Sequence, residues 1–181
     1  MNSIKQIEVL LADRLVGRLA LTKEGLCAFE YAPDWLGSGF SISPFELPLR
    51  SGVFIAKPRP FEGGFGVFDD CLPDGWGLLI LDRYLQQKGI NPRALTLLDR
   101  LALVGSSGRG ALEFRPDHSV VTRQDYADFE KLALEAERIL DSDEYRGKGI
   151  EEFQDRGGSP GGARPKIFAR YEGKEWLVKF R

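Results

Sequence analysis

A glycine-rich stretch and a lysine behind it are the residues of this sequence best suited to bind phosphate. Residues 157–166 read GGSPGGARPK, and residues 175–181 read EWLVKFR, with Lys179 inside an apolar run. Glycines let backbone N–H groups approach an anion closely, and a lysine ammonium neutralises phosphate as a point charge. The combination indicates a nucleotide-phosphate site. Taken singly, the glycines also fit a mobile linker and the lysine a solvent-facing strand residue.

The commonest phosphate-binding motifs do not fit this stretch. A P-loop places glycine before its lysine and a hydroxyl residue after it, whereas Lys166 lies between Pro165 and Ile167. A dinucleotide-binding fingerprint leads from a strand into a helix, and here the loop leads into a predicted hairpin. A protein kinase combines a glycine-rich loop over the phosphates with a lysine on a nearby strand. The loop and Lys179 together favour that interpretation.

The sequence contains few residues that could bind zinc or form another kind of catalytic site. Cys27 and Cys71 are the only cysteines and His118 is the only histidine, so a closed zinc site of the usual kind cannot form. We expect both thiols to be buried and structural. No paired carboxylates and no Ser-His-Asp set stand out. We therefore assign no catalytic residue and no metal ligand.

Composition limits the size and location of the protein. The 181 residues suffice for one domain, or for one domain and a fragment of another. With 25 Lys and Arg against 27 Asp and Glu, the average charge gives no reason to expect nucleic acid or an anionic membrane. Charged residues interrupt the apolar runs of residues 1–19, which excludes a signal-peptide core or a span of about 20 apolar residues. We expect a cytoplasmic protein without a membrane partner.

Short apolar runs between turn residues predict antiparallel strands in the first third of the chain. Residues 7–11 and 16–21 are expected to form a hairpin that turns near Asp13 and Arg14. Residues 26–31 resume extended character until the segment at 33–35 breaks it. Four prolines then exclude long helices and central strands, namely Pro44, Pro48, Pro58 and Pro60.

Helical periodicity follows from residue 65 onwards. Asp74 is the expected N-cap of a helix that turns Leu78, Leu81 and Leu85 inward and stops at Gly89. A second helix is expected to begin after Pro92 and to end at Gly105. Residues 111–115 read as a strand, and a capping box from Thr122 to Asp125 precedes a third helix, at 126–140.

The last part of the chain has a different pattern. Residues 141–156 are charged and lack a strong apolar face, so we expect a boundary between units there. Two extended runs, 167–171 and 175–180, flank a Glu172-Gly173-Lys174 turn and predict a β-hairpin.

In its motifs and their order, the sequence resembles the N-terminal part of the HipA family. The members of this family are the serine/threonine kinase toxins of bacterial type II toxin–antitoxin modules. The matching segments are LVGRL at 15–19, YAPDWL at 31–36, ISPFELPLR at 42–50, FDDCLPDGWG at 68–77, VGSSGRGALEFRP at 104–116, SPGGARPK at 159–166 and WLVKF at 176–180. Each motif is loose by itself, and their order and spacing over most of the chain make the resemblance specific. The family also implies a catalytic loop with its Asp base and Asn, and a metal-binding Asp, which do not appear in these residues.

The resemblance implies an α+β fold. It consists of an N-terminal mixed antiparallel sheet or small barrel with packed helices, followed by the first β-hairpin of a kinase-like N-lobe. The expected domains are a HipA-like N-terminal subdomain at 1–120, a helical connector at 121–156, and a truncated start of a kinase-like lobe at 157–181.

The resemblance also implies site residues and cofactors. The family's ATP-covering loop corresponds to Gly161, Gly162, Ala163, Arg164, Pro165 and Lys166. Lys179 corresponds to the strand lysine that contacts nucleotide phosphates, with ATP and Mg²⁺ as the implied cofactors. Ser159 corresponds to the loop serine whose autophosphorylation ejects the loop and switches the kinase off. A phosphoserine there would repel ATP phosphates, since it adds nearly two negative charges.

Partners follow from the same resemblance. The family implies a DNA-binding antitoxin, the remaining kinase lobe or a kinase subunit, and DNA only indirectly through the antitoxin. Lys57 and Arg59 could touch DNA phosphates in such a complex, or could simply lie in a solvated loop. Six aromatic residues could form either a partner surface or core, namely Trp35, Phe40, Phe45, Phe54, Phe61 and Phe65.

Two interpretations of the chain as a whole remain open. The first is the N-terminal portion of a HipA-like kinase, inactive alone because one loop and one lysine supply neither metal ligands nor a base. The alternative is an antitoxin-like or scaffolding subunit that acts on a kinase in trans, which predicts a stop codon soon after Arg181 and a neighbouring kinase gene. A nucleotide-binding enzyme unrelated to kinases has the weakest support, because no residue set stands out to carry its reaction.

Overall fold

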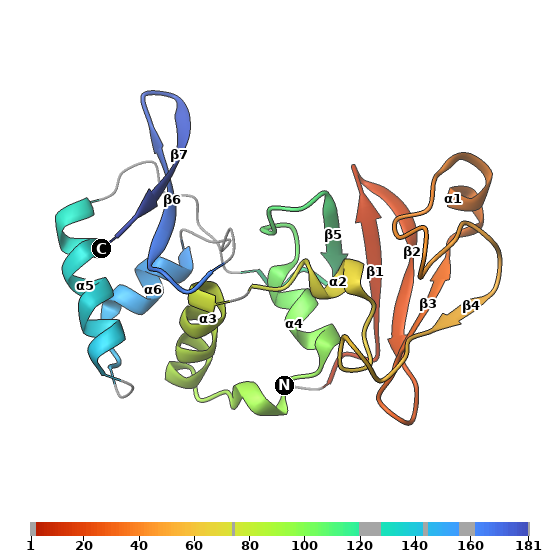
Figure 1. Ribbon diagram of the computed structural model, residues 1–181, viewed down its shortest axis with the longest axis horizontal. Helices are drawn as coiled ribbons and strands as arrows, with labels where there is room; N and C mark the ends of the chain where they lie inside the picture. The colour runs from red at the N-terminus through yellow and green to blue at the C-terminus, as the bar shows by residue number, and fades with distance from the viewer. Residues whose placement is uncertain (1–2, 74, 120–127, 143–144, 156–161, 181) are drawn as a thin grey trace. The chain divides into compact units, whose positions relative to one another are not determined.

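The computed structural model describes residues 3–73, 75–119, 128–142, 145–155 and 162–180 (Figure 1). The chain divides into two compact units that are interleaved along the sequence. The first unit consists of Met1–Leu72 and Leu95–Ser119, and the second of Pro73–Ala94 and Val120–Arg181. Each unit has its own cluster of buried apolar side chains.

An antiparallel sheet forms the centre of the first unit. Its strands, in the described residues, are β1 (Gln6–Leu11), β2 (Arg14–Leu21), β3 (Cys27–Tyr31), β4 (Val53–Ile55) and β5 (Leu112–Arg115), in the order β4-β3-β2-β1-β5. The β1–β2 hairpin turns at Ala12 and Asp13, both with positive φ (49° and 61°). Such a two-residue turn matches the twist of the flanking strands. The predicted hairpin is therefore confirmed, with its turn one residue earlier than expected.

The helices of the first unit are α1 (Pro33–Ser38), α2 (Gly66–Asp69) and α4 (Leu97–Val104). The expected end of the extended run before Pro33 is confirmed, since β3 ends at Tyr31. Pro33 also begins α1, because proline is well tolerated in the first turn of a helix. The expected second helix begins later than predicted. Residues Pro92–Ala94 form a short 3₁₀ helix, η1, and α4 starts after Thr96.

A capping box explains where α4 begins. The Thr96 hydroxyl accepts a hydrogen bond from the Asp99 N–H at 3.2 Å, and the Asp99 carboxylate accepts one from the Thr96 N–H at 2.9 Å. These reciprocal bonds satisfy donors that a helix start would otherwise leave unpaired. Gly105 ends the helix as predicted, with φ of +51°.

Aromatic side chains fill the core of the first unit. Phe29 packs edge-on to Tyr31, with ring centroids 4.9 Å apart, and Phe68 lies between Phe29 and Phe114. Such edge-to-face pairs are favourable beyond the area that they bury. Of the six aromatic residues considered above, Trp35, Phe54 and Phe65 are buried, Phe61 is half-buried, and Phe40 and Phe45 are 57% and 100% exposed.

The second unit combines three α-helices with a β-hairpin in its described residues (Figure 1). They are α3 (Gly75–Gln87), α5 (Phe129–Asp141), α6 (Lys148–Asp155), β6 (Lys166–Tyr171) and β7 (Lys174–Lys179). The hairpin turns at Glu172 and Gly173, where φ is +51° and +72°, as the sequence predicts.

The inward face of α3 differs in part from the prediction. Leu81 and Leu85 are buried as expected, but Leu78 is 37% exposed and Trp76 and Ile80 are buried instead. The predicted N-cap Asp74 and the predicted capping box from Thr122 to Asp125 lie outside the described residues. The cap that the structure shows for α5 is Asp128, whose carboxylate accepts a hydrogen bond from the Lys131 N–H at 3.0 Å.

Residues 141–156 lack a strong apolar face in the sequence, but α6 still buries two apolar side chains. Ile150 and Phe153, three positions apart, are buried in the core of the second unit. Two apolar residues at this spacing lie on one side of a helix. They are enough to pack α6 against the core of the second unit. Surface ion pairs from Lys88 to Glu151 (2.8 Å) and from Lys131 to Glu152 (3.0 Å) also connect α6 to the rest of the unit.

The α+β fold class is confirmed. The domain division at 1–120, 121–156 and 157–181 stays a prediction. Among the described residues, no helix is both long enough and apolar enough to cross a membrane.

Candidate functional site

Two lysines face each other across the hairpin at the end that adjoins the glycine-rich loop. Lys166 begins β6 and Lys179 ends β7, and the two are paired in the strand register. Directly opposed residues of an antiparallel pair project from the same face of the sheet. Lys166 is only 6% exposed, whereas Lys179 is exposed. One ammonium group is thus tied into the protein and the other is open to solvent.

The Gly162 carbonyl fixes the last part of the glycine-rich loop. Its oxygen accepts a hydrogen bond from Lys166 Nζ at 2.9 Å and another from the Trp76 backbone N–H at 3.1 Å. Gly162 has a φ of +85°, a conformation that residues with a side chain rarely adopt. The loop residue, the buried lysine and the first turn of α3 therefore form one contact.

The end of β7 is held by the core of the second unit. The Phe180 N–H donates to the Pro165 carbonyl at 2.9 Å, which closes the hairpin next to Lys179. The Phe180 ring packs edge-on to Phe153, with centroids 5.9 Å apart, and Phe153 packs edge-on to Trp76 at 5.1 Å. Lys179 therefore extends from a strand whose end is anchored by buried aromatic rings.

The structure brings together part of the predicted site. Gly162 and Lys166 are in contact, and Lys166 is paired with Lys179. Between them, Ala163 and Arg164 are exposed and Pro165 is buried. Gly161 and Ser159 lie outside the described residues. The nucleotide-binding role of these residues stays a prediction.

Sequence reasoning missed Gly75 and Trp76 as neighbours of the loop. Both lie in the FDDCLPDGWG segment, which carried part of the family resemblance but no assigned role. A contact between residues so far apart in the sequence leaves no local signal in composition or periodicity. Only the fold of the second unit places them against Gly162.

The described residues suit the phosphates of a nucleotide better than its metal. An exposed lysine and an exposed glycine-containing backbone are groups that bind phosphate oxygens. Within the described ranges, no cluster of three or more His, Cys, Asp and Glu side chains is placed to hold a metal ion.

The two thiols are not activated nucleophiles. Burial raises the pKa of Cys27 to about 11. Burial, and to a smaller extent the charge of Asp70, likewise raises the pKa of Cys71 to about 11. The Cys71 thiol also donates to the Val67 carbonyl, 3.2 Å away. Both cysteines are free, and Cys27 is buried as predicted while Cys71 is half-buried.

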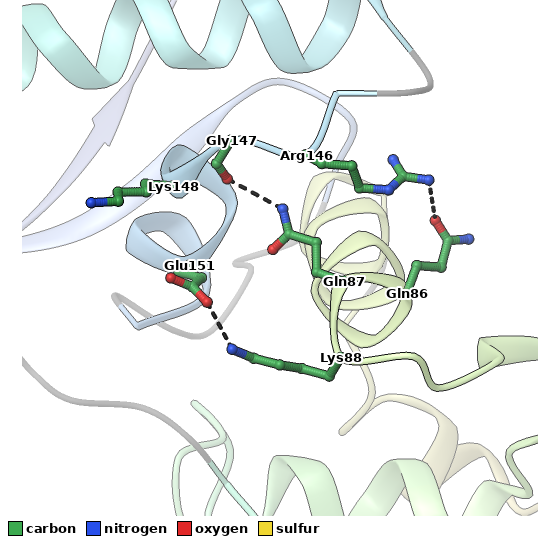
Figure 2. A pocket seen from close by; sticks show the side chains of 7 residues that line it. All are labelled: Gln86, Gln87, Lys88, Arg146, Gly147, Lys148 and Glu151. Carbon is green, nitrogen blue, oxygen red and sulfur yellow. Dashed lines mark hydrogen bonds and ion pairs between the residues drawn. The ribbon is translucent and has the colours of Figure 1, made fainter.

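A separate hollow of about 480 Å³ lies within the second unit, between the end of α3 and the start of α6 (Figure 2). Figure 2 shows that its polar groups bind one another across the hollow: Lys88 pairs with Glu151, and Gln87 donates to the Gly147 carbonyl at 3.3 Å. Arg146 donates to the Gln86 amide oxygen at 3.4 Å. These interactions connect the two helices, and the lining offers no nucleophile paired with a base.

Comparison with known proteins agrees with this architecture. A chain of the solved complex of the Shewanella oneidensis MR-1 toxin–antitoxin system, which contains HipA, HipB and operator DNA, is similar in structure, with a TM-score of 0.53 and 23% sequence identity. That similarity covers 94% of this chain and only 37% of the Shewanella chain, and it concerns the fold alone. The family described as HipA N-terminal domain matches residues 7–115, which are more than half of the sequence. The chain therefore belongs to the HipA family.

Proposed function

We propose that this chain is the N-terminal portion of a HipA-like toxin kinase. Such an enzyme transfers a phosphoryl group from ATP to a serine or threonine of a target protein, in the cytoplasm, and a partner antitoxin neutralises it. Family membership over residues 7–115 supports the assignment. The observation that carries the nucleotide-binding part is the pairing of exposed Lys179 with Lys166, whose ammonium binds the Gly162 carbonyl.

Each of these groups would have a defined task at the phosphates. Lys179 would neutralise phosphate charge from an anchored strand, and residues 162–164 would approach the phosphates with their backbone. Lys166 would hold the loop through Gly162, since its ammonium already binds that carbonyl. ATP bound with Mg²⁺ would supply the phosphoryl group and the metal that neutralises its charge during transfer. Phosphorylation of Ser159 would place like charge beside those phosphates and lower the affinity for ATP.

These residues alone would not catalyse phosphoryl transfer. The reaction needs carboxylate and amide ligands for the metal and a base for the acceptor hydroxyl. The described residues contain no cluster of metal-binding side chains. Incubation with radiolabelled ATP and Mg²⁺ should therefore leave the purified chain unlabelled. Self-labelling at Ser159 would contradict this part of the proposal.

The proposed partner is a DNA-binding antitoxin, so that DNA is reached indirectly. Support comes from the Shewanella complex, which contains HipA together with HipB and operator DNA. In the first unit, Phe40 and Phe45 are exposed and supply apolar surface for a protein partner. Lys57 and Arg59 are also exposed and would face nucleic acid only within such a complex.

Calorimetric titration of ATP with Mg²⁺ tests the nucleotide site. Loss of a charge-assisted contact of about 1.5–3 kcal/mol corresponds to a Kd increase of roughly 10- to 150-fold, which we expect for Lys179→Ala. Lys174→Ala is the matched control, because Lys174 is an exposed lysine at the opposite end of the same strand. No binding by the wild type, or equal binding by both variants, would refute the nucleotide assignment.

The hairpin surface favours a second candidate function. Trp176 and Leu177 are 53% and 41% exposed on opposite faces of a two-stranded sheet, and such small sheets are usually stabilised by further packing. A scaffolding or antitoxin-like subunit could use one of these faces to bind a kinase lobe supplied by another chain. The coding sequence distinguishes the candidates, because an open reading frame that continues into kinase motifs after Arg181 would exclude a separate subunit.

A further inference from the structure

We propose that Gly75 and Trp76, the first residues of α3, are positioning residues for the nucleotide phosphates. They hold the end of the glycine-rich loop so that the Ala163 N–H is presented to a phosphate oxygen. The inference rests on the proposed function, because it needs the loop to bind a nucleotide. It assigns a role to two residues that lie far from the loop in the sequence.

Gly75 provides the space into which the loop packs. A Cβ atom at this position would lie 2.6 Å from both the carbonyl carbon and the carbonyl oxygen of Gly162, and 2.9 Å from the Ala163 nitrogen. These atoms are backbone, so they cannot turn away as the end of a flexible side chain would. Gly75 also has a φ of +47°, in the left-handed region that favours glycine. Only a residue without a side chain allows this close approach.

Trp76 fixes the orientation of the peptide that it touches. Its backbone N–H and Lys166 Nζ both donate to the Gly162 carbonyl. The bond from Gly162 to Ala163 is trans, and in a planar trans peptide the N–H points to the opposite side from the C=O. The Ala163 N–H is therefore directed away from these two donors. In the described part of the chain, no group accepts a hydrogen bond from it.

Trp76 also connects the loop to the strand that carries Lys179. Its ring contacts Phe153, which in turn contacts Phe180, the residue after Lys179. The backbone of Trp76 thus holds one phosphate-binding segment while its side chain supports the other. Small displacements of groups that bind a reacting phosphate can cause large losses of binding or rate. The start of α3 consequently controls the spacing between the Ala163 N–H and the lysine.

Gly75→Ala is the direct test, and Gly89→Ala is its matched control. Both glycines have positive φ, but an added Cβ at Gly89 meets no atom within 4 Å. Any conformational strain is therefore shared, while the clash with Gly162 is specific to Gly75. Titration with ATP and Mg²⁺ should show a Kd at least about 10-fold higher for Gly75→Ala and nearly unchanged for Gly89→Ala. If the wild type binds ATP and Gly75→Ala binds equally well, the inference is wrong and the proposed function stands.

A measurement on the wild type keeps the test decisive should Gly75→Ala fail to fold. In the ¹⁵N-labelled protein, nuclear Overhauser effects should connect the Gly75 α-protons to the Ala163 amide proton. The Ala163 amide signal should also shift on titration with ATP and Mg²⁺, with the Kd found by calorimetry. Absence of either signal in a protein that binds ATP overturns the inference alone. A wild type that binds no ATP overturns the nucleotide assignment, and the positioning role with it.

Discussion

Replacement of Asp99 should weaken the first unit, and the loss should depend on pH. The Asp99 carboxylate, at a residue that is 7% exposed, accepts three hydrogen bonds: from the Ile4 N–H at 3.0 Å, the Thr96 N–H at 2.9 Å and the Thr96 hydroxyl at 2.7 Å. One carboxylate thereby caps α4 and anchors the segment before β1. Asp99→Ala removes both functions at once.

The magnitude follows from those two functions. Loss of a helix cap destabilises by about 1 kcal/mol, and loss of a hydrogen bond to a charged acceptor by about 1.5–3 kcal/mol when its donor stays buried. The segment at Ile4 is only partly buried, so water can replace much of that bond. We therefore expect the free energy of unfolding to fall by about 2–3 kcal/mol at pH 7.

The pH dependence has a definite sign. Burial alone would raise the pKa of Asp99, but the hydrogen bonds from Ile4 and Thr96 outweigh it, so the pKa is lowered in the folded protein. A lowered folded-state pKa stabilises the fold above the unfolded-state value of about 3.9, and this contribution is lost as the pH falls through the folded-state pKa. The difference between the wild type and Asp99→Ala should therefore be constant near neutrality and should shrink below about pH 4.

Native-state hydrogen exchange of β1 amides as a function of pH measures this difference within the first unit. Glu30→Gln is the control, because Glu30 is an exposed acid on β3. It should change stability by less than about 0.5 kcal/mol. A difference for Asp99→Ala that stays constant from pH 7 to pH 3, or that grows on acidification, would refute the proposed cause. A loss as small as that of Glu30→Gln at pH 7 would refute the magnitude.

Two further predictions concern the thiols and a tightly packed glycine of the first unit. At pH 8 a thiol with a pKa of about 11, as for Cys27 and Cys71, should react with a disulfide reagent at least about 10-fold more slowly than a thiol with a pKa of about 8.5, because its smaller thiolate fraction outweighs its greater nucleophilicity. Rapid labelling of the folded protein would contradict this. Gly17→Ala should destabilise the sheet by about 1–3 kcal/mol, since an added Cβ would lie 2.6 Å from Phe29 Cζ and closer still to the Glu30 carbonyl oxygen. Gly37→Ala, in α1 with no atom near the added Cβ, should be neutral or slightly stabilising. Thermal denaturation of both variants measures these changes in stability, and equal effects would contradict the clash at Gly17.

Local signals allowed much of the fold to be predicted from the sequence. Both hairpins turn between runs of apolar residues, and the second residue of each turn, Asp13 or Gly173, is of a type that tolerates positive φ. The start of α4 was misplaced because Pro92 suggested an earlier beginning, while the box from Thr96 to Asp99 was not recognised. Only two residues form the apolar face of α6, too few to give a clear period.

The candidate site was predictable only where its residues are close in sequence. The glycine-rich loop and Lys179 stood out because their residue types suit phosphate and because a hairpin connects them. Gly75 and Trp76 could not be found in this way, since their role depends on a long-range backbone contact with Gly162. The burial of Lys166 was also unexpected, because lysine is usually exposed and its hydrogen bond to Gly162 is a product of the fold.

The residues that match the family do not coincide with either structural unit, because the two units are interleaved along the sequence. The match to the HipA N-terminal domain ends at residue 115 and includes α3, yet α3 packs in the second unit, where Trp76 and Ile80 share a core with residues of α5, α6 and the hairpin. A two-stranded hairpin is marginally stable by itself, so the geometry at Lys179 depends on that shared core. The support for the candidate site therefore comes partly from inside the matched region and partly from beyond it. For this reason, substitutions in α3 are the most direct way to disturb the loop without altering any of its own residues.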